Sequence, residues 1–308
     1  MLPAVSHIAS AQSYPTRPVR IIVGFTAGGS TDIGARLIGQ WLQDRLGQSF
    51  IIENRPGAAG TIATAAVLRA AADGYTLLLN TVADAINGAL YEQPNFDFIR
   101  DIAPIASIAR APFVMVVSSS FPAKTLPEFI AYAKANPGKI TMASQGNGSP
   151  GHVFGELFKM MVGIDMIHVP YRGDVPALTD LLGGRVQVLF GSMIASLAQI
   201  RAGKLRPLGA TIAARLEPLP DVPPIGETVP GFEASGFLGM VAPKNTPAQI
   251  VEKLNREVNA SLAEPTVRSQ LVDQGYTVFT TSPGGYGELI AAESEKWTKV
   301  IKFAGIKP

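Results

Sequence analysis

Cysteine is absent from this chain of 308 residues, and histidine occurs three times. The lack of cysteine excludes disulfides, thiolate nucleophiles and every cysteine-based metal site. Three imidazoles leave little material for a histidine metal centre. We therefore expect no bound metal and no cofactor.

Charge and long apolar runs are also scarce. Charged residues make up 16% of the chain, against about 25% in an average soluble protein. The 26 basic and 24 acidic residues form no run of one sign, which disfavours nucleic acid and anionic membranes as partners. The longest apolar stretch, Ala103 to Val117, is interrupted by Pro104, Arg110 and Pro112, so it falls short of the roughly 18 residues of a membrane-spanning helix.

The first residues carry one property of a secretory signal. They end in Ala9-Ser10-Ala11, small residues of the kind that precede a signal-peptidase cut, but a basic start and a full apolar core are missing. We interpret residues 1–11 as the remnant of a truncated or mis-started signal peptide. An ordinary N-terminus is the alternative.

Strand-like apolar runs alternate with helical periodicity, which predicts an α/β fold of mixed, mainly parallel sheets with helices on both faces. The length predicts about two domains, at roughly 150 residues each. Strands are predicted at 19–25, 50–53, 75–79, 113–117, 140–143, 166–169, 186–190 and 276–279, and helices at 33–46, 61–72, 126–135, 150–162, 175–182, 247–262, 264–273 and 285–303.

A proline-rich segment, residues 217–230, separates the second series of elements from the last helices. It has no period of its own and is interpreted as a linker that returns to the first domain. The predicted domains are residues 12–110 with 236–308, and residues 111–235, joined by two crossover segments.

Two glycine-rich turns each follow a predicted strand and open a predicted helix. The first runs from Gly24 to Asp32, and the second from Ser144 to His152. Glycine lets the backbone approach a ligand closely, and the N–H groups and dipole of a helix N-terminus attract an anion. One such turn in each domain predicts a cleft that closes on an anionic ligand. For each turn alone, a capped turn without a ligand is the alternative.

The second turn contains Gly146-x-Gly148-x-x-Gly151, which matches the dinucleotide fingerprint in its glycines alone. That fingerprint needs an acidic residue about 20 residues further on, at the end of the next strand. Here the next strand ends at Tyr171 without a carboxylate. Nucleotide binding is therefore disfavoured.

A serine hydrolase is also poorly supported, because Asn147 replaces the first glycine of Gly-x-Ser-x-Gly around Ser149. Two histidines lie beyond the N-terminal segment. His152 is a candidate ligand residue of the second turn, or an exposed residue of the first helical turn. His168, on a strand, reads most simply as a core residue.

Motifs in nearly the whole chain, from about Tyr14 to Phe303, resemble the Bug-type solute-binding proteins of tripartite tricarboxylate transporters. The matching stretches are Pro18–Phe25, Ala27–Gly29 with Asp32, Glu53–Gly60, Asp73–Leu77, Gly146–Ser149 with His152, Val169–Gly173, Ala177–Gly184 and Ala242–Pro247. The resemblance implies a two-domain periplasmic binding protein of the clamshell type (type II-like), without catalysis. It would hold a small carboxylate, which we expect to be an amino acid, a mono- or dicarboxylic acid or an aromatic acid, between its domains and present it to membrane permease subunits. We expect a monomer.

The resemblance also assigns the ligand-binding residues by position. The first turn would grip the carboxylate, the second turn would hold it from the other domain, and Thr81 and Tyr171 would line the cleft. In this reading Asp32 anchors the loop and water rather than the anion. The gripping residues are Phe25, Ala27, Gly28, Gly29 and Asp32 in the first turn, and Ser144, Gly146, Gly148, Ser149 and His152 in the second.

Two departures from the family pattern each add a carboxylate near the expected cleft. Asp84 stands in Ala83-Asp-Ala-Ile-Asn87 where many members carry Thr-His-Ala-Ile-Asn, and Asp174 replaces the last glycine of Tyr-Lys-Gly-Gly. Fixed negative charge repels a polyanion, so we hypothesise a preference for zwitterionic or single-carboxylate ligands over citrate-like ones. The alternatives are an exposed Asp84 and an Asp174 that caps a helix.

Three function classes follow from these residues. A solute-binding protein is favoured, because two anion-binding turns occur without a recognisable catalytic set. A ligand-sensing partner of a periplasmic sensor shares the same fold. A hydrolase that uses Ser149 or His152 is the least supported. Closure around a ligand would use hinge residues near Arg110 and Ser235.

Overall fold

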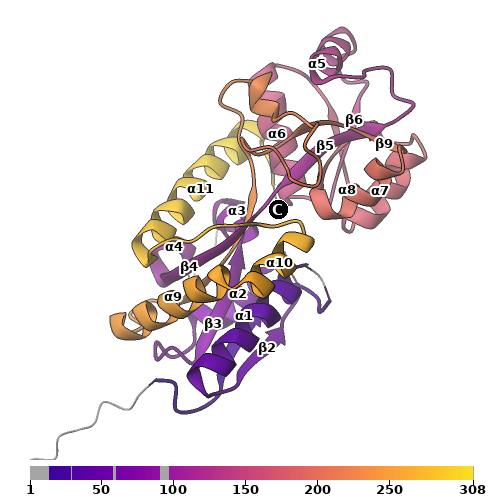
Figure 1. Cartoon of the computed structure of the whole chain (residues 1–308). Coiled ribbons are helices and arrows are strands. Elements are labelled where there is room, and N and C mark those ends of the chain that lie inside the picture. Colours follow the sequence, from indigo (N-terminus) through magenta and orange to yellow (C-terminus); the bar gives the residue numbers. More distant parts are fainter. Residues whose placement is uncertain (1–13, 29, 58–59, 91–96, 308) are drawn as a thin grey trace, which may run out of the picture.

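The computed structural model describes residues 14–28, 30–57, 60–90 and 97–307. The predicted signal remnant, residues 1–11, and the predicted ligand residue Gly29 lie outside these described residues. The strands form two separate sheets (Figure 1). We call the six-stranded sheet with its helices the first unit and the five-stranded sheet with its helices the second unit.

The first unit contains helices on both faces of its sheet. Ile21 shares a hydrophobic cluster with α1, α9 and α10, and the adjacent Ile22 shares another with α2, α3 and α11, because successive side chains of a strand point to opposite faces. The strands, in spatial order, are β11 (Thr277–Val278), β4 (Ile102–Ala111), β10 (Gly236–Pro243), β3 (Thr76–Thr81), β1 (Val19–Val23) and β2 (Phe50–Asn54). The helices are α1 (Ser30–Leu46), α2 (Thr61–Leu68), α3 (Val82–Leu90), α4 (Phe98–Asp101), α9 (Ala248–Ala263), α10 (Pro265–Asp273) and α11 (Pro283–Ala304).

The second unit has the same layered design. Met115 and Val116 are neighbours in one of its strands and point to opposite faces, toward α5 and α6 and toward α7 and α8 respectively. Its strands, in spatial order, are β7 (Ile167–Pro170), β6 (Thr141–Ser144), β8 (Val188–Ser192), β5 (Phe113–Ser118) and β9 (Leu205–Ala210). Its helices are α5 (Leu126–Ala135), α6 (Pro150–Val162), α7 (Asp174–Leu182), α8 (Met193–Arg201) and the 3₁₀ helix η2 (Ile225–Glu227).

The chain crosses between the units twice, and the two crossovers run side by side. Strand β4 continues into β5 with only Pro112 between them, and the return enters β10 at Gly236, which pairs with Ala111 of β4. The Arg110 guanidinium donates a hydrogen bond to the Ser235 hydroxyl at 3.0 Å. The two predicted hinge residues are therefore in direct contact.

Strand direction places the carboxyl ends of the parallel strands at the border between the units. Strand β4 ends at this border, and β1, β2 and β3 run parallel to it because β10, which lies between β4 and β3, is antiparallel to both. Strand β5 begins at the border, so β6, β7 and β8, which run opposite to β5, end there. Both glycine-rich turns therefore face the same border.

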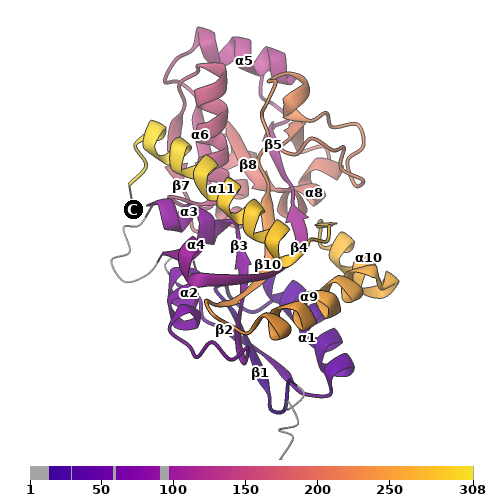
Figure 2. The same ribbon diagram turned by 90° about the vertical axis from the view of Figure 1, so that its left-hand side faces the viewer.

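Helix α11 ties the two units together along one side (Figure 2). It packs on α3 and β4 of the first unit and on α6 of the second. The fully buried Trp297 of α11 stacks on Phe154 of α6, with ring centroids 5.0 Å apart. One hydrophobic cluster consequently extends through both units.

These sheets confirm the predicted two-part α/β fold class, with one correction. Parallel pairing is confined to β1, β2 and β3 and to β6, β7 and β8, whereas the crossover strands and their neighbours pair antiparallel. Strands β4, β9 and β10 and helices α3, α4, α8 and η2 were not predicted from the sequence. Prolines lie inside β4 and β9, and β10 carries two glycines, which weakens the strand signal. The domain boundaries at 110 and 236 stay a prediction.

We expect Trp297→Ala to lower the free energy of unfolding by about 3–5 kcal/mol, the range for truncating a buried aromatic side chain. The matched control is Phe303→Ala in the same helix, because the Phe303 side chain is 66% exposed. Urea unfolding measures both. Equal losses in the two variants would contradict the proposed bridging role of the Trp297–Phe154 stack.

Candidate functional site

The buried side chain of Asp32, which is 2% exposed, holds the first turn in place. Its carboxylate accepts hydrogen bonds from the backbone N–H of Gly28, from Nε of Arg36 and from Nδ2 of Asn54, each at 2.9 Å. The Asn54 amide also donates to the Phe25 carbonyl at 3.0 Å. The tip of the turn, residues 26–28, is exposed, so the loop presents backbone to solvent while its support is buried.

The Asp32 carboxylate is ionised in this setting. Burial alone would raise the pKa of Asp32, but the hydrogen bonds from Arg36 and the two amides outweigh burial and hold this pKa below its usual value. Asp32 thus receives all three of these hydrogen bonds from other residues of the protein. This geometry agrees with a loop-anchoring role for Asp32, while contact of the other predicted residues of this turn with a ligand stays a prediction.

The second turn is organised by its own hydroxyls. The fully buried Ser144 hydroxyl lies 2.6 Å from Nε2 of His168 and accepts from the Gly146 N–H at 3.2 Å. The Ser149 hydroxyl caps α6 by accepting from the His152 N–H and donates to Oε1 of Gln145. A hydroxyl has a single O–H to donate, so both serines already use theirs within the protein.

Gln145 is not among the predicted ligand residues, yet it holds the second turn to the rest of the unit. Its Oε1 accepts from the Gly151 N–H at 3.1 Å, and its Nε2 donates to Oδ1 of Asp174 at 2.8 Å and to the Phe190 carbonyl at 3.1 Å. A single amide side chain therefore connects three elements. Gln145 lies between the predicted ligand residues Ser144 and Gly146. This position is the signal in the sequence that could have identified it as a residue of the site.

The two histidines stack beneath the second turn. The rings of His152 and His168 are 3.5 Å apart with an interplanar angle of 6°, and His152 is 5% exposed. Nδ1 of His152 accepts from the Gly148 N–H at 3.1 Å, so this nitrogen is unprotonated. The alternative of an exposed first-turn His152 is therefore wrong.

Both rings are held neutral by their surroundings. Burial, with the neighbouring His168 and Lys159, lowers the pKa of His152 to about 3. Burial and Lys159 lower the pKa of His168 to about 4. Near neutral pH the pair is an uncharged support for the turn.

Asp84 and Thr81 form a capping box at the start of α3. The Thr81 hydroxyl accepts from the Ala83 N–H at 3.2 Å, and the Asp84 carboxylate reaches back to the Thr81 N–H at 2.8 Å. The other Asp84 oxygen accepts from the Thr64 hydroxyl. Asp84 is 7% exposed, so the alternative of solvent exposure is wrong. Burial raises the pKa of Asp84 to about 6, against the effect of these hydrogen bonds.

Asp174 and Tyr171 follow β7 at the border. Asp174 accepts from Gln145 and from the Ser192 hydroxyl at 3.0 Å, whereas the N-cap of α7 is Gly173. The helix-cap alternative for Asp174 is therefore wrong, and its carboxylate links the second turn to the end of β8. The Tyr171 hydroxyl donates to Asp180 of α7 at 2.8 Å. Ligand contacts of Asp84, Asp174 and Tyr171 stay predictions.

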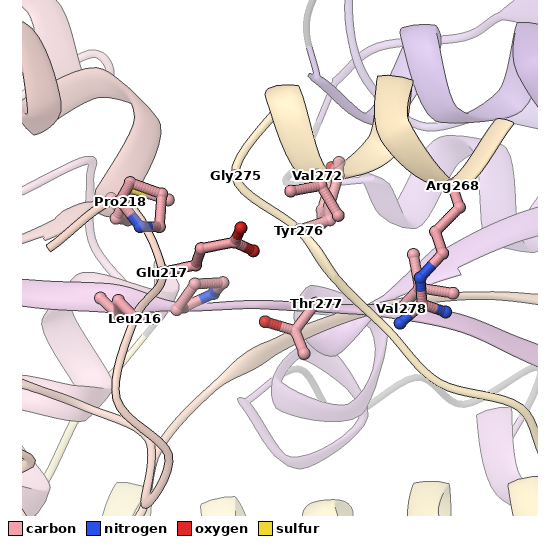
Figure 3. Close-up of a pocket in the computed structure, with 11 residues that line it drawn as sticks. Leu216, Glu217, Pro218, Arg268, Val272, Gly275, Tyr276, Thr277 and Val278 are labelled. Carbon is pink, nitrogen blue, oxygen red and sulfur yellow. The ribbon is translucent and has the colours of Figure 1, made fainter. Parts of the chain in front are cut away.

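A separate pocket of about 110 Å³ lies beside the crossover, between the α10–β11 segment and the chain after β9 (Figure 3). Glu217 extends from one side toward the Gly275–Tyr276 segment, and Arg268 comes from α10 on the other (Figure 3). None of the residues that line this pocket belongs to the two glycine-rich turns. The candidate ligand site formed by the turns is therefore a different place from this pocket.

The arrangement of the two units defines a class of protein. Two α/β units joined by paired crossovers, with helix N-terminal turns of both units facing one border, form the clamshell of a solute-binding protein. Among the described helices, none is long and apolar enough to cross a membrane.

Comparison with known proteins identifies the family. Residues 34–306 match the family described as the tripartite tricarboxylate transporter family receptor, TctC, and the chain belongs to this family. BugT of Bordetella pertussis is 37% identical over 301 residues, which cover 97% of this chain and 92% of BugT.

Solved structures agree with this assignment. An R. palustris protein solved with adipate is 39% identical, with a TM-score of 0.83, 96% of this chain and 99% of that chain covered. MatC from Rhodopseudomonas palustris, solved with bound malate, is 32% identical, with a TM-score of 0.79, 94% of this chain and 100% of that chain covered. The resemblance found in the sequence motifs is thereby confirmed.

Acid should destabilise the protein through the histidine pair. The unfolded rings titrate near 6.5, but the folded pKa values of His152 and His168 are about 3 and about 4, so the pair's stabilisation is complete above pH 6.5 and lost as pH falls. At about pH 5 each ring costs on the order of 2 kcal/mol. We expect His168→Gln to reduce the stability lost between about pH 7 and 5 in urea unfolding. An unchanged loss would contradict a neutral, partly buried His168 ring.

Asp84 should act in the opposite direction over the same pH range. Its folded pKa of about 6 lies above the ordinary value of 3.8, so its ionisation costs stability as pH rises from about 4 to 6, and acidification returns that stability. We therefore expect Asp84→Asn to lose more stability than the wild type between about pH 7 and 5, by about 1–2 kcal/mol. The same urea series measures this, and a shallower pH dependence would overturn it.

Proposed function

We propose that this protein is a periplasmic receptor that captures a small carboxylate between its two units and delivers it to the permease subunits of a tripartite tricarboxylate transporter. The observation that carries the proposal is the convergence of the two glycine-rich turns on one border, each at the N-terminus of a helix of more than three turns. The membership of this chain in the transporter receptor family supports the proposed role in transport.

The proposed chemistry is anion capture by backbone. The serine hydroxyls and the Asp32 carboxylate are occupied in holding the turns, and so are the N–H groups of the turn glycines that they and their neighbours bind. The helix dipoles and the remaining main-chain N–H groups of the turns are therefore the proposed partners of a carboxylate. Ordered water would complete the contacts. No step of this scheme needs catalysis, and we propose that the protein binds its ligand without converting it, as a monomer.

The proposed ligand class is based on the ligands of related proteins and on the charged residues near the predicted cleft. The two R. palustris structures carry adipate and malate, which are small carboxylates of the size an interdomain cleft accepts. Asp84 and Asp174 add negative charge close to the predicted cleft, at the ends of β3 and β7. We propose amino acids and small mono- or dicarboxylates as ligands, with citrate disfavoured because its third carboxylate meets this charge.

Calorimetry of the unliganded protein against glutamate, malate, adipate, benzoate and citrate tests the proposal. We expect at least one of the first four to bind more tightly than citrate. Failure of all five to bind would overturn the carboxylate receptor, and tight citrate binding that Asp84→Ala leaves unchanged would overturn the proposed charge preference.

The anchoring of the first turn can be tested with a matched pair of variants in α1. We expect Asp32→Ala to weaken binding of the best ligand about tenfold or more, because losing a charge-assisted hydrogen-bond set costs on the order of 1.5–3 kcal/mol. Asp44→Ala, which removes an exposed carboxylate of the same helix, should leave the affinity unchanged. Circular dichroism confirms that both variants are folded. Equal affinities would contradict the role of Asp32.

A further inference from the structure

The tip of the second turn touches the first unit and not only its own. The side-chain amide of Asn147 donates a hydrogen bond to the backbone carbonyl of Lys307, which follows α11. In both ribbon views the C-terminal end of the chain lies beside α3, at the border between the units (Figures 1 and 2). The first unit therefore reaches across the border to the ligand-binding turn.

A second contact lies at the neighbouring residue. Gly148 has a positive φ of 69°, and a methyl group added to it would lie 2.5 Å from Cδ2 of Leu90, the last residue of α3. Helix α3 begins at the Thr81–Asp84 capping box. The same short helix thus joins the cleft end of β3 to the tip of the second turn.

The tail that carries Lys307 is itself held in place. Gly305 ends α11 in the left-handed conformation, and its N–H and that of Ile306 both donate to the Ile301 carbonyl, as in helix C-caps of the Schellman type. The Ile306 side chain packs on the large hydrophobic cluster shared by both units. The Lys307 carbonyl consequently has a defined position toward Asn147.

From these contacts we infer that Asn147 is a positioning residue of the ligand site, and that the C-terminal tail of the first unit sets the shape of the second turn. The inference rests on the proposed carboxylate binding. On the other side of the turn, the Gly148 N–H is held by His152. The second turn is thus held from one side by the second unit and from the other side by the first unit. The shape that the turn offers to a ligand therefore depends on how the two units are placed relative to each other.

A double-mutant cycle separates positioning from direct contact. Asn147→Ala removes the donor, and Ile306→Gly detaches the tail while leaving Asn147 in place. The ligand is the acid that binds most tightly in the calorimetric series. We expect each single variant to bind it three- to tenfold more weakly than the wild type does. The affinity of the double variant should be no lower than the lower of the two single-variant affinities. Phe303→Ala, the exposed neighbour on α11, should bind like the wild type.

The outcomes of the cycle are distinct. If Asn147 contacted the ligand directly, Ile306→Gly would leave the affinity unchanged or the two losses would multiply, and either result overturns the inference. Asn147→Gln, which retains the amide donor, should recover part of the affinity lost in Asn147→Ala. Urea unfolding checks that the single variants remain folded under the conditions of the binding measurement. If the wild type binds none of the acids, the proposed carboxylate binding itself is wrong. If the wild type binds but the variants do not behave as expected, only the proposed effect of the C-terminal tail on the second turn is wrong.

Discussion

The pairing of the two crossover strands is the constraint on which the rest of the structure depends. Strands β4 and β10 lie side by side in the middle of the first sheet, and Gly236 meets Ala111 so closely that an added methyl would lie 3.0 Å from the alanine side chain. Because β4 runs directly into β5, the direction of one pair of strands fixes the direction of both sheets. The border, and the turns that face it, follow from this pairing.

The two units obey one topological rule although the sequence shows no repeat. In each sheet the first strand of the parallel set lies between the second and third, and a crossover strand follows the third. A turn after the first parallel strand therefore occupies matching places in the two units. Convergence of the two glycine-rich turns is a consequence of the topology, and not of similarity between the turns.

The sequence predicted the parallel strands, most helices and both turns, because local periodicity and glycine patterns mark them. The sequence does not predict strand β10 although all eight of its residues are buried, because Gly239 replaces the branched side chain that a strand pattern requires. That glycine is needed, since a methyl there would lie 1.9 Å from the Tyr286 hydroxyl. Long-range contacts of this kind, like the stacking of His152 on His168, leave no local signature.

The turn residues also show why residue type alone could not settle roles within the site. Ser144, Ser149, Asp84 and Asp174 carry the polar groups expected of ligand contacts, yet each is engaged with protein partners. Burying such groups is favourable only when they are hydrogen-bonded, so they rigidify the turns. In the binding mode that we propose, their rigidity would preorganise the remaining main-chain N–H groups of the turns for an anion, which reduces the ordering cost of binding. Selectivity in a site of this kind resides in the shape of the turns, and that shape is set by buried side chains that need never touch the ligand.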